Sequence, residues 1–321
     1  MNYLNWYILV QTLIFLFSFF FVKSTLHLFK KFNCKQLVRE EGPKSHLYKK
    51  NTPTMGGIYF SLFMSIYMLV TYALKPNVFD QSLFGLYVLF MMFGLLGFVD
   101  DFCKLFMRKG LSMTVKMLLQ VLVSLLWSLY FMPHHTIHVP GLISLELSLT
   151  QSIIWGSFVI VSCVNAINFT DGLDGLMIQT VLIVMFGFIF VSFAMDQSPS
   201  LFYMGVFSCL ILLMIYPFNT YPAKIFIGDT GSMSIGAIVA GLALLQNIEV
   251  PLILMGIVFV LETLSVAIQI ISFKLFKKRV FKMAPIHHSF ELSGWHEQEV
   301  VRLFTIITLI GTVIALWWIK G

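Results

Sequence analysis

The stretch Asn165-Ala-Ile-Asn-Phe-Thr-Asp171-Gly-Leu-Asp174-Gly-Leu176 lies between two long apolar runs, of which the first covers residues 153–164. Two carboxylates and two carboxamides therefore sit at the mouth of a predicted helix hairpin, in a chain where only 11% of residues are charged. If the turn continues as helix, Asp171 and Asp174 share one face, because residues three apart are neighbours on a helix. Repeated Asp-Gly is also typical of a plain turn, so this stretch alone leaves function and turn open.

The composition is that of a protein embedded in a bilayer, because 58% of the 321 residues are hydrophobic. No soluble domain or repeat is evident, so we predict one integral membrane domain over residues 1–321. The fold class is all-α, a polytopic membrane protein with ten transmembrane helices. The eighth span has 13 residues, which is short for a bilayer crossing. The predicted spans are Tyr3–Val22, Gly56–Leu74, Leu83–Val99, Met113–Met132, Ser152–Ile167, Leu176–Met195, Leu201–Phe218, Met233–Leu245, Pro251–Phe273 and Val300–Ile319.

The basic residues indicate how the chain is oriented. Of the 21 Lys and Arg, all but Lys75 and Lys320 lie in or beside the loops that follow odd-numbered spans. The positive-inside rule places those loops in the cytoplasm and both termini outside. The net charge of +6 therefore reports topology, and secondarily attraction to anionic lipids and substrates. It is no indication of nucleic-acid binding.

Adjacent aspartates end the third predicted span. Asp100 and Asp101 repel each other at a membrane boundary unless protons or cations neutralise them. A surface network with Lys104, Arg108 and Lys109 is one way to achieve this. A divalent cation carried by a diphosphate is the other, and carboxylate oxygens suit Mg²⁺.

A fifth aspartate precedes the eighth span, in Gly228-Asp229-Thr-Gly-Ser232. Capping of the next helix by Asp or Ser is the simpler explanation. Asp229 nevertheless lies on the same predicted side as the other four aspartates, and independent caps have no reason to favour one side. Lys116, about one turn into the fourth span, faces that side too, where it either binds a phosphate or snorkels to the interface. We therefore expect one cytoplasmic-face site.

The first cytoplasmic loop ends in a stretch that contains Lys49 and then Pro53-Thr-Met-Gly56-Gly57. Proline followed by two glycines at a helix start predicts free backbone N–H groups, which with Lys49 would cradle a phosphate. The alternative is an ordinary helix start beside positive-inside charge.

Three histidines, His134, His135 and His138, follow the fourth span on the outer side, opposite the aspartates. Val139-Pro-Gly141, between alternating residues, predicts a small extracytoplasmic hairpin there. We expect no catalytic role for these histidines.

The ninth span contains Glu262 and Gln269, and polar residues within a membrane span are either functional or bonded to a neighbouring helix. His287 and His288 follow Pro285 on the acidic side, where they are candidate hydrogen-bond donors to phosphate.

Together these groups suit a reaction between two phosphate-bearing molecules, one from water and one a lipid, with Mg²⁺ neutralising a diphosphate. The competing class is an ion-coupled transporter, in which the same acids line an ion path. Transporters usually carry broken helices and polar groups near the midplane in paired halves. Here the polar groups cluster at the cytoplasmic ends and no internal repeat is found, which favours an enzyme.

These residues resemble the motif series of the MraY family, the phospho-N-acetylmuramoyl-pentapeptide-transferases, within the polyprenyl-phosphate N-acetylhexosamine-1-phosphate transferase superfamily. The resemblance runs nearly end to end, in the same order and with the same topology. The motifs are Thr52–Gly57, Asp100–Asp101, Asn165–Gly175, Asn219–Ser232 and Ala284–Glu291.

Two details refine the resemblance. Ala284-Pro-Ile-His-His288 is similar to this family and differs from relatives that use N-acetylglucosamine donors, which remain the alternative function. Ser289 stands where the family usually has a third histidine, so no catalytic role is carried over to it.

The resemblance implies transfer of phospho-MurNAc-pentapeptide from UDP-MurNAc-pentapeptide to undecaprenyl phosphate, giving lipid I and UMP. It implies that Asp229 holds Mg²⁺, that Asp100 and Asp101 deprotonate or position the lipid phosphate, and that His287 stabilises phosphate charge. Phe226 would stack on uracil. The implied substrate-binding residues are Lys49, Thr52, Lys104, Lys116, Asn168, Asp171, Asp174, Asn219, Phe226, Gly228, Ser232, Gln269 and His288.

The resemblance further implies a multi-pass protein of the bacterial plasma membrane, with a bent ninth span that leaves a groove for the polyprenyl chain, and a homodimer. Direct attack by the lipid phosphate and a two-step route through a phospho-enzyme are both compatible with the residues. We favour direct attack, because a phosphate monoester has a second pKa near about 6 and is mostly dianionic at neutral pH.

Overall fold

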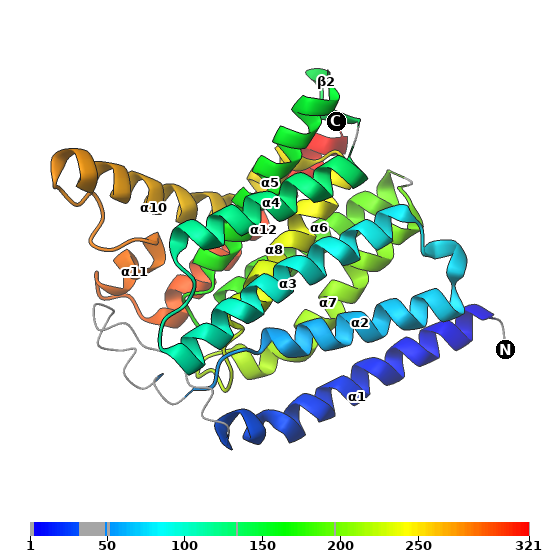
Figure 1. The fold of residues 1–321 in the computed structure, drawn as a ribbon, viewed down its shortest axis with the longest axis horizontal. Helices are drawn as coiled ribbons and strands as arrows, with labels where there is room; N and C mark the ends of the chain where they lie inside the picture. The colour runs from blue at the N-terminus through cyan, green and yellow to red at the C-terminus, as the bar shows by residue number, and fades with distance from the viewer. Residues whose placement is uncertain (1–2, 32–48, 50–51, 133, 196, 321) are drawn as a thin grey trace.

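A computed structural model describes residues 3–31, 49, 52–132, 134–195 and 197–320 of the chain (Figure 1). The described part confirms the all-α class, since ten helices are long and apolar enough to cross a membrane. The helices are α1 Tyr3–Lys31, α2 Gly57–Leu74, η2 Pro76–Val78, α3 Gln81–Met107, α4 Met113–Phe131, α5 Leu149–Thr170, α6 Leu176–Ala194, α7 Pro199–Asn219, α8 Gly228–Leu245, α9 Glu249–Met255, α10 Ile257–Phe276, α11 Ile286–Glu291 and α12 Glu297–Lys320.

The predicted outer hairpin is confirmed. Strands β1 (His135–Val139) and β2 (Ile143–Leu147) pair antiparallel, with His135 opposite Leu147 and Val139 opposite Ile143. Gly141 in the turn has φ +70°, a conformation that glycine adopts without strain.

The eighth span begins at Gly228 and not at the predicted Met233, so α8 has 18 residues and is long enough to cross. Polar residues concealed its first turn in the sequence. In the folded protein their hydroxyls are bonded: Thr230 Oγ1 donates to Asp101 Oδ2 at 2.7 Å and Ser232 Oγ to Gly228 O at 3.0 Å. They are also shielded from lipid, because α8 is the most enclosed of the ten spans.

Helices α2 and α3 touch the start of α8 almost backbone to backbone. A Cβ added to Gly97 of α3 would lie 2.1 Å from Asp229 O, and one added to Gly57 of α2 would lie 2.1 Å from Gly231 N. Small residues permit this approach, which is typical of packed membrane helices. The N-terminus of α8 is therefore wedged between α2 and the C-terminal half of α3.

The predicted ninth span is two helices and not one. α9 ends at Met255 and α10 begins at Ile257, with Gly256 between them. The orange helix α10 extends away from the other spans, and the short α11 lies beside it (Figure 1). Many apolar side chains of α10 are exposed, among them Leu261, Leu264 and Ile268.

Candidate active site

Three aspartates from two distant segments meet at the junction of α3 and α8. One carboxylate oxygen from each of Asp100, Asp101 and Asp229 lies within 4.8 Å of the others. Asp100 and Asp101 are buried, with 2% and 3% of their surface exposed. Hard cations such as Mg²⁺ prefer oxygen ligands of this kind, so the three residues could hold a metal ion. We call them the acidic cluster.

Two lysines neutralise part of the acidic cluster. Lys104 Nζ lies 2.7 Å from Asp100 Oδ2 and 3.0 Å from Asp229 Oδ2. Lys116 pairs with Asp229 and lies 3.6 Å from Asp100 Oδ2. Three carboxylates and two ammonium groups leave one net negative charge when all are ionised. The lysines can turn toward phosphate oxygens when another cation balances the acids.

Asn168 fixes the orientation of Asp229. Its Nδ2 donates to Asp229 Oδ1 at 3.0 Å and to Ser232 Oγ at 2.8 Å. The helix hairpin of the opening motif therefore reaches the cluster through its second asparagine. The first, Asn165, instead donates to Gln120 Oε1 at 2.7 Å.

Asp101, and not Asp229 or Ser232, caps α8. Asp101 accepts the backbone N–H of Asp229 at 3.2 Å and that of Thr230 at 2.9 Å, together with the Thr230 hydroxyl at 2.7 Å. Gly228, with φ +72°, admits this carboxylate, since a Cβ there would lie 2.7 Å from Asp101 Oδ2. A cap supplied by another helix leaves no local signal in the sequence around α8.

Asp171 and Asp174 do not share a helix face, because the helix ends before them and the turn, one of the two interpretations left open by the sequence, is what forms. The residues between Thr170 and Leu176 form turns, with Asp171 as the C-cap of α5. Burial of the Asp171 carboxyl, together with the nearby charge of Asp229, raises its pKa well above the usual value. The two Asp-Gly pairs therefore form the turn between α5 and α6 and also hold the two carboxylates in it.

A second polar group surrounds Lys49. Its Nζ lies 2.7 Å from Asp174 Oδ1 and 2.6 Å from Glu297 Oε1, and all three side chains are buried. Asp174 Oδ2 also accepts the backbone N–H of Ala223 at 2.8 Å, and its own N–H donates to Glu297 at 2.6 Å. Burial is the largest influence on the Asp174 carboxyl and raises its pKa, against the opposing effect of Lys49. Glu297 was not among the residues that the sequence indicated, because nothing near it in the chain points to a contact with Lys49.

Gly56 and Gly57 do not form a phosphate cradle, and the other interpretation of this stretch, an ordinary helix start, is the one that the structure supports. Gly56 N donates to Phe226 O at 2.8 Å and Gly57 N to Ile227 O at 2.9 Å, so neither N–H group is free. Phe226 N in turn donates to Pro53 O at 2.8 Å. The glycines therefore join two distant loops, and Phe226 is held with its ring 6.0 Å from Lys49 Nζ.

Other predicted residues lie around this loop pair. Thr52 Oγ1 donates to Ala223 O at 3.5 Å, and Asn219 Nδ2 donates to Ile225 O at 3.1 Å. Asn219 is buried, and its Oδ1 has no hydrogen-bond partner within the described residues.

The remaining predicted residues lie on α10 and α11, on either side of the loop that joins these helices. Gln269 Oε1 accepts from Val280 N at 3.1 Å and Phe281 N at 3.0 Å, which fastens this loop to α10. Ser289 likewise bonds both backbone groups of Met283, donating to its carbonyl at 2.5 Å and accepting from its N–H at 3.1 Å. Ser289, which stands where the family usually has a histidine, therefore holds the loop between α10 and α11 in place.

His287 and His288 lie ring to ring on α11, with centroids 4.1 Å apart. His287 Nδ1 lies 3.0 Å from Glu262 Oε1, and His288 Nδ1 lies 2.8 Å from Glu291 Oε2. A Cβ on Gly172 would lie 2.2 Å from His287 Nε2, so α11 packs against the loop that follows α5.

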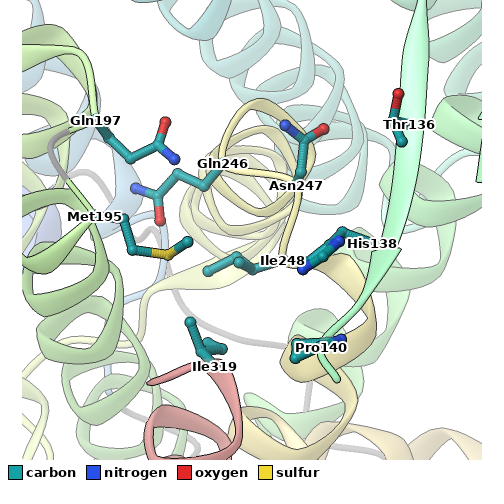
Figure 2. Close-up of a pocket in the computed structure, with 9 residues that line it drawn as sticks. All are labelled: Thr136, His138, Pro140, Met195, Gln197, Gln246, Asn247, Ile248 and Ile319. Atoms are coloured by element: carbon teal, nitrogen blue, oxygen red, sulfur yellow. The ribbon is translucent and has the colours of Figure 1, made fainter. Parts of the chain in front are cut away.

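The outer histidines lie apart from these groups. His135 Nε2 lies 2.8 Å from Glu249 Oε1, which also accepts from Trp155 Nε1 at 3.2 Å, so His135 ties the hairpin to α9. A cavity of about 260 Å³ opens beside the hairpin (Figure 2), lined by His138 and by eight other residues that include none of the predicted site residues. The cavity and the acidic cluster are separate places.

Comparison with known proteins identifies close relatives. Residues 83–247 match the model of glycosyl transferase family 4. A phospho-N-acetylmuramoyl-pentapeptide-transferase of Carboxydothermus hydrogenoformans is 40% identical over 299 residues, covering 89% of this chain and 90% of that protein. Proteins with the same description from Clostridium kluyveri (41% over 292 residues, 88% and 90%) and Staphylococcus epidermidis (38% over 313 residues, 94% and 96%) are also similar.

Proposed function

The chain belongs to the phospho-N-acetylmuramoyl-pentapeptide-transferases of glycosyl transferase family 4, and on that premise we propose how its side chains divide the reaction. The family resemblance of the motifs is thereby confirmed. The protein is a multi-pass bacterial membrane enzyme that transfers phospho-MurNAc-pentapeptide to form lipid I in peptidoglycan synthesis. We propose UDP-MurNAc-pentapeptide as its donor and undecaprenyl phosphate as its acceptor, with UMP released.

We propose that the acidic cluster holds Mg²⁺, with Asp229 as its principal ligand. The observation that supports this is the convergence of three carboxylate oxygens within 4.8 Å from α3 and α8. Mg²⁺ would neutralise the donor diphosphate and the charge that develops on the leaving UMP. Since Lys104 and Lys116 already lie against Asp229, they are placed to bind phosphate oxygens beside the metal.

Asp100 and Asp101 serve the acceptor in this proposal. Asp100 Oδ1 accepts from Leu111 N at 2.7 Å, so its carboxylate is fixed before substrate arrives. Asp101 holds the first turn of α8, and thereby Asp229, in register with it. The lipid phosphate attacks the donor phosphorus directly, because at neutral pH it is mostly dianionic and needs little activation.

The group around Lys49 binds the donor nucleotide and sugar. Phe226, anchored through its backbone to Pro53, stacks on uracil. Lys49, Asp174, Asn219 and Thr52 supply hydrogen bonds around it. His287 packs from α11 against the loop that carries Asp174, and together with His288 it stabilises phosphate charge.

The polyprenyl chain of the acceptor lies along α10. The break at Gly256 lets this helix leave the other spans (Figure 1). Its exposed apolar side chains offer a surface to a lipid tail. We further propose that the enzyme works as a homodimer.

The test is UMP release by the purified full-length protein in detergent with undecaprenyl phosphate and Mg²⁺. UMP is expected with UDP-MurNAc-pentapeptide and not with UDP-GlcNAc, and chelation of Mg²⁺ is expected to abolish it. Turnover of UDP-GlcNAc, or full activity in EDTA, would contradict the substrate or the metal respectively.

A further inference from the structure

A glutamate inside a membrane-spanning helix contacts a predicted catalytic histidine. Glu262 of α10 and His287 of α11 both have 0% of their surface exposed, and Oε1 of the one lies 3.0 Å from Nδ1 of the other. A buried carboxylate in a membrane span is costly, and pairing with an imidazole offsets only part of that cost. Residues of this kind are functional candidates by default.

The contact with Glu262 determines which ring nitrogen of His287 is available for a further hydrogen bond. An ionised carboxylate only accepts hydrogen bonds, so Nδ1 carries the hydrogen and the other ring nitrogen, Nε2, is left. Among the described residues Nε2 has no hydrogen-bond partner, and neither has Glu262 Oε2. Buried polar atoms usually have a hydrogen-bond partner, so leaving these two atoms without one costs folding free energy.

The free nitrogen is aimed at a functional loop. A Cβ on Gly172 would lie 2.2 Å from His287 Nε2, so this edge of the ring faces the loop between α5 and α6. Gly172 directly follows Asp171 in that loop. The ring cannot turn about its own axis without breaking the bond to α10.

The geometry points to Glu262 as a positioning residue that holds His287 with Nε2 toward the Asp171 loop. A carboxylate behind an imidazole fixes the orientation and the tautomer of the ring, the arrangement also found behind metal-bound histidines. An imidazolium Nε2–H donates a charge-assisted hydrogen bond to a phosphate oxygen, which a neutral ring with hydrogen on Nδ1 cannot do. This inference rests on the proposed role of His287 toward phosphate.

The chain contains a matched control. Glu249 and His135 form a second buried Glu–His pair, 2.8 Å apart, in the outer hairpin region. Glu262→Gln and Glu249→Gln therefore make the same chemical change at similar burial, and only the first is expected to alter chemistry. Both variants are purified at full length, and kcat, KM for UDP-MurNAc-pentapeptide and the thermal unfolding midpoint are measured.

Glu262→Gln is expected to lower kcat by about tenfold to hundredfold, the worth of a hydrogen bond to a charged group, with KM changed less than about threefold. Glu249→Gln is expected to lower the unfolding midpoint and leave kcat unchanged. Glu262→Asp keeps the charge on a shorter side chain, and its kcat is expected to lie between those of the wild type and Glu262→Gln.

A double-mutant cycle decides whether Glu262 acts through His287. His287→Asn is expected to lower kcat at least as far as Glu262→Gln, and adding Glu262→Gln to it is expected to cost nothing more. An unchanged kcat in Glu262→Gln, an equal loss in both backgrounds, or a loss that tracks the unfolding midpoint across the Glu262 variants would each overturn the inference. Full activity in His287→Asn would instead refute the proposed role of His287.

Discussion

Gly97→Ala is expected to damage the acidic cluster without touching any of its side chains. The added Cβ would lie 2.1 Å from the carbonyl oxygen of Asp229, whereas an unstrained contact needs about 3.4 Å. The helices α3 and α8 must therefore separate locally by about 1.3 Å, the difference between these two distances. A shift of about 1 Å in reacting groups can cost about a hundredfold in rate, so kcat is expected to fall by that order.

A Gly→Ala change in α3 has two effects on stability that oppose each other, a favourable one from helix propensity and an unfavourable one from steric overlap. Alanine favours a helix over glycine by about 1 kcal/mol, while overpacking costs about 1–3 kcal/mol. Gly94→Ala, one turn earlier in α3, is the control, because its Cβ would meet Ser234 Cβ at an ordinary 3.4 Å. Gly94→Ala is expected to retain kcat and to unfold at the wild-type midpoint or above it.

UMP release and thermal unfolding of both variants in detergent provide the assay. If Gly97→Ala turned over within about twofold of the wild type while remaining folded, the close approach of α3 and α8 would not be what positions Asp229.

The remaining predictions concern separate groups. Asp229→Asn is expected to lower kcat by more than about a hundredfold and to weaken the response to added Mg²⁺; near-normal turnover would remove its metal role. Phe226→Ala is expected to weaken UMP binding by about 1–3 kcal/mol in calorimetry, and an unchanged affinity would exclude stacking on uracil. His135→Ala is expected to lower the free energy of unfolding by about 1–3 kcal/mol, since Glu249 loses a partner, at unchanged kcat; a large kcat loss would mean that the outer hairpin takes part in catalysis.

The sequence predicted the helical class, the outer hairpin and the meeting of acids from separate loops. Each depends on patterns along the chain: apolar length, a Pro-Gly turn, and charges that recur on one side of the membrane. The start of α8 was missed because Thr230 and Ser232 look polar in sequence, although their hydroxyls bond Asp101 and the helix backbone and the first turn is enclosed by protein.

The contacts that could not be predicted join residues far apart in the chain. Asp101 caps a helix that begins 127 positions later in the sequence, at Gly228. Glu297 pairs with Lys49, which lies 248 positions earlier in the sequence. Gly56 and Gly57 resembled an anion cradle because their local geometry suits one, but distant carbonyls already accept their N–H groups. The local sequence shows that a backbone N–H group is able to bind an anion, but it does not show that a carbonyl from a distant segment already occupies that group in the folded protein.

The most direct test of a shared metal and diphosphate centre is a Mn²⁺ titration followed by electron paramagnetic resonance, with UDP-MurNAc-pentapeptide present. The acidic cluster predicts one tightly bound Mn²⁺ per wild-type chain, displaced by Mg²⁺, and none in folded Asp229→Asn. Equal Mn²⁺ binding by the wild type and Asp229→Asn would contradict it.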